Sequence, residues 1–545
     1  MNLLETIKDL PSHVSAYGWV PFVVAILLSL LFSSLYVRHF WNRGERRDGY
    51  SACISMIGIS IALLSASLLP VDVFLVSFMK NDDGSFKEWA SNSTRQTIED
   101  SVTYAYYSLY GIIFFYTFFV LPLTYFSYEE RDDDYGNSVN VFPTALMYTL
   151  IFLLLVTGLL VAGAFIPYQV TPPQNSTEWD KIEFMIRELY QNRGKDAISF
   201  VVNVLTIYGM LNTLLYTSVG LASFPITMIK GFLSLREEES NLSKSQSTIQ
   251  AKINNLRNKQ VIKSLTSREI AQLADLEEEE SLVSKRSSLL ESQKRSLSHR
   301  CNCVLRIVNV LLGCLGIVFS LVFFVSLLIS NIDKLMNSLG YKMGYVLKEN
   351  VLPNPLDYIM VEAQRVFPLD YVLFFSIILF LLICTVSGIR YLGICCLFVP
   401  MYKIRPGRTP PQGLIMLSFI LMFAVLAFNI LVFSAVPTYF TFGSQYYCKP
   451  PNATDLVTNS TCDRTHCTLD ASSDDCVMTR GAAFVLSFAF KAWVFAASYY
   501  WLTWGFLVQF VVSFIFILIR SRRSTLEEAI DRDDFEDSDD HLVRI

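Results

Sequence analysis

Long apolar runs separated by polar segments organise the chain. A membrane-spanning helix needs about 20 consecutive, mainly apolar residues. Nine runs meet this length, at about 18–37, 53–79, 103–126, 143–168, 197–229, 303–330, 370–398, 413–437 and 494–519. The pattern predicts an all-α polytopic membrane protein with nine transmembrane helices. Pro70 lies inside the second run and is expected to break that helix, because proline removes a backbone donor and clashes with the preceding turn.

Composition agrees with a lipid environment. The chain has 545 residues, of which 52% are hydrophobic and 17% charged, whereas soluble proteins carry about 25% charged residues. A net charge of −5 gives no reason to expect nucleic-acid binding. The first apolar run is too long for the core of a signal peptide, and its arginines follow it rather than precede it.

Two features predict the orientation. Four arginines follow the first run and three follow the last, which favours a lumenal or extracellular N-terminus and a cytoplasmic C-terminus. With nine spans, this orientation places four Asn-x-Ser/Thr glycosylation sequons in non-cytoplasmic loops, at Asn92, Asn175, Asn452 and Asn459. A fifth sequon at Asn241 falls in a cytoplasmic loop and should remain unmodified. Single sequons occur by chance, but four of five agree with the orientation.

Four cysteines lie in the polar segment after the eighth run, at Cys448, Cys462, Cys467 and Cys476. On the oxidising side of a membrane an even number of cysteines indicates disulfides, here two bonds with three possible pairings. Cys462, His466 and Cys467 also have the chemistry of metal ligands, but disulfides are the favoured interpretation and no metal site is predicted.

The longest polar segment between the apolar runs, residues 230–301, is charged and contains no proline. Apolar residues at helical spacing, including Ile249, Ile253, Leu273 and Leu276, predict two antiparallel helices at about 234–263 and 267–299. This cytoplasmic hairpin is interpreted either as a solvated strut or as a platform for a partner or a second copy, so a homodimer is one alternative.

The runs and polar segments divide the chain into six parts. These are transmembrane helices 1–5 (1–229), the cytoplasmic helical hairpin (230–301), helices 6–8 (302–437), a lumenal disulfide-containing loop (438–493), helix 9 (494–519) and an acidic disordered tail (520–545).

Catalytic motifs are absent from the sequence. It contains no phosphate loop, zinc-binding H-E-x-x-H helix or G-x-S-x-G nucleophile elbow. None of the five histidines lies within an apolar run. An enzyme is therefore not expected, and transport, reception or escort remain as function classes.

Three charged residues lie in or beside the apolar runs near the lumenal side, namely Asp72, Asp370 and Lys491. Ionisable residues in membrane segments are candidate functional groups. One interpretation is that Asp72 caps a helix broken at Pro70. The alternative is a polar lumenal vestibule in which these three residues meet a polar ligand or protons.

Six segments of the chain resemble a known family. They are LLPVDVFLVSFMKNDDGSFKEWA (68–90), YEERDDD (128–134), NSTEWDKI (175–182), FPLDY (367–371), GIRYLGI (388–394) and YKIRPGRTPPQ (402–412). In content and order they are similar to the limb-region-like membrane proteins, relatives of the lipocalin-interacting membrane receptors. Family members are described with nine spans and a lumenal N-terminus.

The resemblance implies a role in exporting cobalamin (vitamin B12) from lysosome to cytosol. In the family this role is linked to an ATP-binding-cassette half-transporter, which is escorted from the endoplasmic reticulum. Cobalamin would then be a transported ligand, and no covalently bound cofactor is expected. The lysosomal membrane is the expected location, with the endoplasmic reticulum and plasma membrane as further sites.

Family members are also linked to clathrin-adaptor binding and insulin-receptor endocytosis through the large cytoplasmic loop. This sequence departs from them there, because residues 230–300 contain neither Tyr nor Trp and so carry no tyrosine- or tryptophan-based sorting signal.

Two functions follow from these observations. The first is a transporter that binds cobalamin and passes it through the helical bundle. The second is an escort or receptor that binds the half-transporter and has no conduit of its own. The hairpin and the cysteine-rich loop favour the escort.

Overall fold

The computed structural model describes most of the apolar runs and part of the polar segments. The described ranges are 12–41, 49–81, 84–133, 141–164, 195–230, 235–262, 298–338, 351–364, 368–396, 399–407, 409–449, 463–467, 475–486 and 493–519, with isolated positions at 273, 276, 280, 283, 284, 340, 345, 347 and 366.

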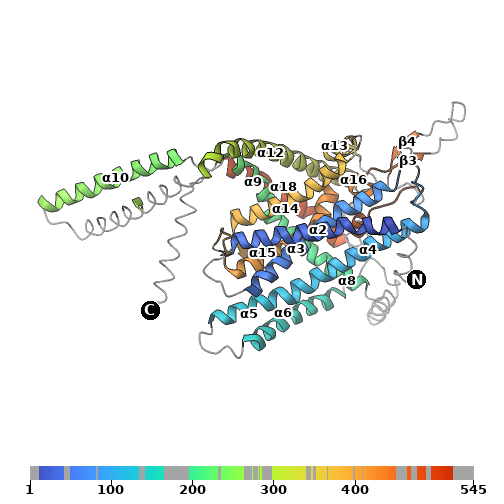
Figure 1. The fold of residues 1–545 in the computed structure, drawn as a ribbon, viewed down its shortest axis with the longest axis horizontal. Helices are drawn as coiled ribbons and strands as arrows, with labels where there is room; N and C mark the ends of the chain where they lie inside the picture. Colours follow the sequence, from blue (N-terminus) through green and yellow to red (C-terminus); the bar gives the residue numbers. More distant parts are fainter. Residues whose placement is uncertain are drawn as a thin grey trace. The chain divides into compact units, whose positions relative to one another are not determined.

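Helices dominate the described residues (Figure 1). In the first half of the chain they are α2 (Ser12–Phe40), α3 (Gly49–Phe78), α4 (Asn92–Phe115), η1 (Tyr116–Val120), α5 (Leu121–Asp133), α6 (Val141–Ala164), α8 (Lys195–Asn212), η2 (Thr213–Thr217), α9 (Ser218–Lys230) and α10 (Leu235–Ile262). In the second half they are α12 (Ser298–Asn337), α13 (Pro355–Ala363), α14 (Leu369–Leu392), α15 (Pro411–Ala435), α16 (Pro437–Phe442), α17 (Arg480–Phe484) and α18 (Trp493–Ile519).

Eight helices among the described residues are long and apolar enough to cross a membrane. They correspond to eight of the nine predicted runs. The remaining run contains α6, whose apolar part Phe142–Gly158 is shorter than these eight. The mostly helical membrane fold is confirmed, whereas the count of nine spans and the orientation stay predictions.

Two predicted details are wrong. Helix α3 continues through Pro70 from Gly49 to Phe78, so the proline does not break it. The seventh span ends at Leu392 rather than at residue 398, because Gly393 adopts a φ of 80° that favours glycine and terminates α14. The chain then forms the antiparallel hairpin of β1 (Ile394–Cys396) and β2 (Val399–Tyr402).

The chain divides into two compact units, Met1–Ser223 with Phe319–Phe514 (unit 1) and Phe224–Val318 with Ile515–Ile545 (unit 2). Helix α15 forms the centre of unit 1 and contacts α3, α8, α14 and α5. In the apolar window of α15, 89% of the residues are buried. In the other seven candidate spans this share is between 22% and 61%. Helix α15 is therefore enclosed by protein, and the helices around it carry the exposed apolar side chains expected to face lipid.

Small residues allow close helix packing in unit 1. A Cβ added to Gly388 on α14 would overlap the carbonyl oxygen of Tyr216, and one added to Gly220 would overlap that of Cys384. The hydroxyls of Thr217 and Thr385 are hydrogen-bonded across the same contact, 2.8 Å apart. Small residues with a polar bond between helices are typical of membrane interfaces.

Unit 2 contains α10, which agrees with the predicted helix 234–263. Ile249 and Ile253 of α10 pack with Val283 in a small apolar core, and Leu273 and Leu276 lie against it. The predicted apolar seam is therefore present, although most of the second predicted helix (267–299) lies outside the described residues. At the end of α9, Lys230 Nζ donates to the carbonyls of Ile517 (2.7 Å) and Leu518 (2.8 Å), so a cation caps the end of α18.

Candidate functional site

The predicted loop 438–493 contains two short buried helices, α16 and α17. Tyr439 and Phe440 of α16 and Ala482 of α17 are at most 1% exposed. A helix leaves its first backbone N–H groups without intrahelical acceptors. In helices this short, most N–H groups are of that kind, and in a buried setting each needs an acceptor from elsewhere.

Asp357 supplies the acceptor for α16. Its carboxylate accepts the backbone N–H groups of Thr438 (3.2 Å) and Tyr439 (3.1 Å). Asp357 lies in the first turn of α13, which begins after the capping residue Asn354. Burial raises the pKa of Asp357 to about 6, while the hydrogen bonds from Tyr439 and Thr438 act in the opposite direction.

Asp72 supplies the acceptor for α17. Its Oδ2 accepts the backbone N–H of Gly481 at 2.7 Å and the hydroxyl of Tyr106 at 3.2 Å, and the residue is 2% exposed. Asp72 therefore caps α17 rather than its own helix α3. The interpretation that it caps a helix broken at Pro70 is wrong, because α3 is continuous.

A third buried carboxylate, that of Asp370 in the first turn of α14, also bonds to α16. Its Oδ2 accepts the hydroxyl of Tyr439 at 3.0 Å. Tyr439 thus connects two carboxylates, donating its backbone N–H to Asp357 and its phenol to Asp370. Burial raises the pKa of the Tyr439 hydroxyl, and the charge of Asp370 adds to that effect. We name Asp72, Asp357, Asp370, Tyr439 and Gly481 the α16 site.

The two short helices are also bonded to each other. Thr479, the N-cap of α17, donates its backbone N–H to Thr441 (2.9 Å) and its hydroxyl to the Phe440 carbonyl (2.8 Å). Arg480 forms an ion pair with Glu99 of α4. Burial lowers the pKa of Arg480, while the nearby charge of Asp72 acts to raise it.

Two members of the predicted group, Asp72 and Asp370, bind different partners. No hydrogen bond joins Asp72 to Asp370 among the described residues, and Lys491 lies outside them. Asp357, Tyr439 and Gly481 were not singled out from the sequence. Asn354-Pro355, a capping residue followed by proline, is a recognisable start of α13 and so a signal for Asp357.

Strands β3 (Tyr446–Lys449) and β4 (Asp463–His466) lie in the sequence between α16 and α17, and they pair with each other in antiparallel orientation. Cys467 and Cys476 form a disulfide, which removes one thiolate from the alternative metal set. Cys448 lies in β3, and Cys462 lies outside the described residues, so a second bond between them stays a prediction. Lys80 Nζ donates to the Tyr446 carbonyl at 2.8 Å, and burial lowers the pKa of Lys80 to about 8.

Of the predicted glycosylation residues, Asn92 is exposed in the first turn of α4. Asn175, Asn452 and Asn459 lie outside the described residues. Asn241, predicted to stay unmodified, lies in α10. Glycosylation at these positions remains a prediction.

Chemically, the α16 site is an anchoring arrangement. Each of its three carboxylates accepts a hydrogen bond from residues 438–481, and these acceptors hold α16 and α17 among the spanning helices. Hydrogen-bonded buried carboxylates stabilise a structure best when every lone pair has a donor.

Comparison with known proteins identifies the family. The family description "LMBR1-like membrane protein" matches residues 19–285. A "Probable lysosomal cobalamin transporter" of Nematostella vectensis is 38% identical, with the match covering 98% of this chain and 99% of that protein. A "Lysosomal cobalamin transport escort protein LMBD1" is 37% identical in Danio rerio (97% and 98% covered) and 36% identical in Gallus gallus (96% and 97% covered).

No solved structure matches the chain. The match to the curated relatives extends over nearly the whole length of both sequences, so it spans the stretches of chain that hold the α16 site and the hairpin. The chain belongs to the LMBR1-like membrane protein family.

Proposed function

We propose that this chain is a lysosomal membrane protein that escorts a partner transporter in the export of cobalamin from lysosome to cytosol. The observation that carries the proposal is full-length similarity to proteins named as lysosomal cobalamin transport escorts. Escort is preferred to conduction because these relatives carry the word escort in their names.

Two cavities in the described part of unit 1 are small. One of about 10 Å³ is lined by residues of α12, α15 and α18, and one of about 30 Å³ lies between Tyr110, Asn203, Asn429 and Tyr499. Pockets for drug-sized ligands have volumes of about 300–1,000 Å³, and a corrinoid is larger than most such ligands. Neither of these two cavities is large enough to hold a corrinoid.

The partner would be an ATP-binding-cassette half-transporter. This chain has no phosphate loop of its own, so the energy for export would come from the partner. The escort would begin in the endoplasmic reticulum and end in the lysosomal membrane. Docking through the spanning helices would use the exposed apolar side chains of α12 and α18, and docking through the hairpin would use α10.

Reconstitution separates escort from conduction. The purified chain is placed in liposomes loaded with cobalamin, with and without the half-transporter and ATP. We expect cobalamin efflux only when the partner and ATP are present. Efflux from liposomes that contain this chain alone would overturn the escort proposal in favour of a transporter.

Cells lacking the chain test the escort step itself. Without it, the half-transporter should retain the immature glycans of the endoplasmic reticulum, and re-expression should restore maturation. Ile253→Asp, placed in the buried seam of the hairpin, is paired with Lys252→Asp on the exposed side of α10. Loss of partner maturation with the first variant alone would assign docking to the hairpin; normal maturation without this chain would refute the escort.

A further inference from the structure

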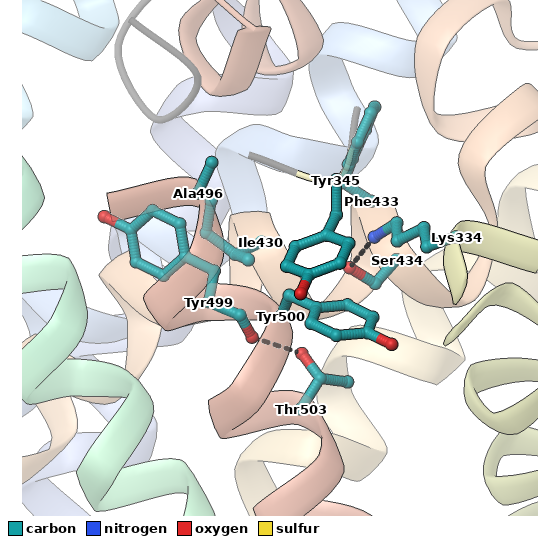
Figure 2. Close-up of a pocket in the computed structure, with 9 residues that line it drawn as sticks. All are labelled: Lys334, Tyr345, Ile430, Phe433, Ser434, Ala496, Tyr499, Tyr500 and Thr503. Carbon is teal, nitrogen blue, oxygen red and sulfur yellow. Dashed lines mark hydrogen bonds between the residues drawn. The ribbon is translucent and has the colours of Figure 1, made fainter. Parts of the chain in front are cut away.

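We propose that the cavity around Lys334 in unit 1 binds a single small anion, and that chloride is the anion whose chemistry and size fit it. Lys334 reaches the cavity from the last turns of α12, Ser434 from the end of α15, and Tyr500 and Thr503 from α18 (Figure 2). The inference is independent of the escort proposal, because it concerns a site that no cobalamin chemistry requires.

Lys334 forms no ion pair among the described residues, and the one charge that acts on its ammonium is that of the adjacent Asp333. Its Nζ donates to the Ser434 hydroxyl at 3.3 Å, and an ammonium has three N–H donors. The neighbouring carboxylate of Asp333 is directed elsewhere, accepting from Asn337 (2.6 Å) and from the backbone N–H of Val351 (3.0 Å). A charge removed from water is costly unless it is paired, so an ammonium facing a cavity favours an anion within it.

The size of the cavity restricts the choice of anion. Its volume of about 10 Å³ is close to the space that one water molecule requires. Carboxylates, phosphates and sulfate contain several heavy atoms and exceed that volume. A monatomic anion also exceeds a water molecule in size, but by less than these polyatomic ions do, and the positive charge of Lys334 disfavours a cation there.

The remaining lining is compatible with an anion. Thr503 donates its hydroxyl to the Tyr499 carbonyl at 2.8 Å, and Lys334 donates one of its N–H groups to the Ser434 hydroxyl (Figure 2). Two N–H groups of Lys334 and the proton of Ser434 are then the donors that an anion could use. The rings of Tyr345 and Tyr500 stack with centroids 4.2 Å apart. The edges of an aromatic ring carry positive partial charge, and its faces carry negative partial charge. Because Tyr345 and Tyr500 turn their faces towards each other, their positive edges are the parts that an anion can approach.

Tyr345 also has an unusual backbone. It adopts a φ of 57°, which is uncommon for a residue other than glycine and especially for a bulky one. Strained residues of this kind gather at ligand clamps, where the surrounding structure holds them. The stack of Tyr345 on Tyr500 closes one wall of the cavity.

Thermal unfolding of the purified protein in detergent tests the site. The midpoint is measured at one pH and one ionic strength while sodium gluconate is replaced stepwise by sodium chloride. We expect a saturable rise of a few degrees with chloride, because a ligand that binds only the folded state stabilises it. Bromide should act like chloride, and sulfate should give no saturable rise, only the gradual stabilisation that it gives folded proteins in general.

Variants assign the effect to the cavity. Lys334→Met should abolish the chloride dependence, and Ser434→Ala should raise the half-saturating chloride concentration several-fold. Lys244→Met, which removes an exposed lysine from α10, is the control and should retain the wild-type response. If Lys334→Met does not fold, Ser434→Ala carries the test. An equal midpoint in both salts would mean that the cavity holds only water and would overturn the proposal. A wild-type chloride response in both Lys334→Met and Ser434→Ala would place the anion elsewhere and would also overturn it.

Discussion

Gly481 donates its backbone N–H to the carboxylate of Asp72 over 2.7 Å, although 409 positions separate the two residues in the chain. A buried aspartate within an apolar membrane helix thereby has a defined role in the fold. It holds the start of α17, a helix of five residues, against α3. Because its donors, Gly481 and Tyr106, come from other helices, the carboxylate fixes tertiary structure rather than the local helix.

Two replacements of Asp72 should distinguish the contribution of its hydrogen bonds to stability from the contribution of its charge. Asp72→Asn keeps a carbonyl acceptor for Gly481 and should lower the free energy of unfolding by about 1 kcal/mol. Asp72→Leu leaves the Gly481 N–H and the Tyr106 hydroxyl buried without a partner, which should cost roughly 2–4 kcal/mol. The readout is the thermal unfolding midpoint in detergent. Tyr106→Phe, which removes one donor only, should resemble Asp72→Asn, and equal midpoints for Asp72→Leu and wild type would contradict the anchoring role.

Gly388→Ala tests the close packing of α14 in unit 1. The added methyl would overlap the Tyr216 carbonyl, so the helices would have to separate, at a cost of roughly 1–3 kcal/mol. Gly111→Ala is the matched control, because nothing lies within 4 Å of its added Cβ. We expect a lower unfolding midpoint and lower yield for Gly388→Ala and no loss for Gly111→Ala. Similar midpoints for both variants would show that the contact is not tight.

Asp357 predicts a pH dependence of stability. Its pKa in the folded protein is about 6, above the value of about 3.9 in an unfolded chain. Between these two values the folded state binds more protons, so its stability falls as pH rises and is greater in acid. From pH 7 to pH 5 the gain is about 1 kcal/mol. Unfolding midpoints measured at both pH values should show it.

Asp357→Asn provides the control for this prediction. The amide does not titrate but keeps an oxygen for Thr438 and Tyr439, so the variant should lose most of the difference between pH 5 and pH 7. A variant with the wild-type pH dependence would assign the effect to another group.

Glycan mapping tests the predicted orientation. Asn92→Gln, Asn175→Gln, Asn452→Gln and Asn459→Gln should each remove one glycan, seen as a faster-migrating band that deglycosidase treatment no longer shifts. Asn241→Gln, on α10, should leave the pattern unchanged. A glycan at Asn241 would reverse the orientation of the chain.

The spanning helices could be predicted from the sequence because long apolar runs have few alternatives. The seam of the hairpin was also predictable, since Ile249 and Ile253 lie at helical spacing and pack together with Val283. Both kinds of element are defined by local pattern. The confirmed parts of the fold are therefore those in which neighbours along the chain carry the information.

The α16 site could not be predicted from the local pattern of apolar and polar residues. Helices α16 and α17 have six and five residues, too few for a periodic signal, and both lie inside a segment predicted as a loop. Asp72 and Asp370 were identified as unusual because a carboxylate stands out among apolar residues. Their partners Gly481 and Tyr439 were not, because a backbone N–H and a tyrosine in an apolar setting are ordinary in sequence.

The number of residues between Asp72 and Gly481 also determines how long after Asp72 its bonding partner is synthesised. Ribosomes add about 5–20 residues per second, so the 409 positions that separate the pair take about 20–80 s to synthesise. During that interval the helix that carries Asp72 has been made, but Gly481, whose N–H donates to the carboxylate, has not. The contact between α3 and α17 can therefore form only after nearly the whole chain has been made.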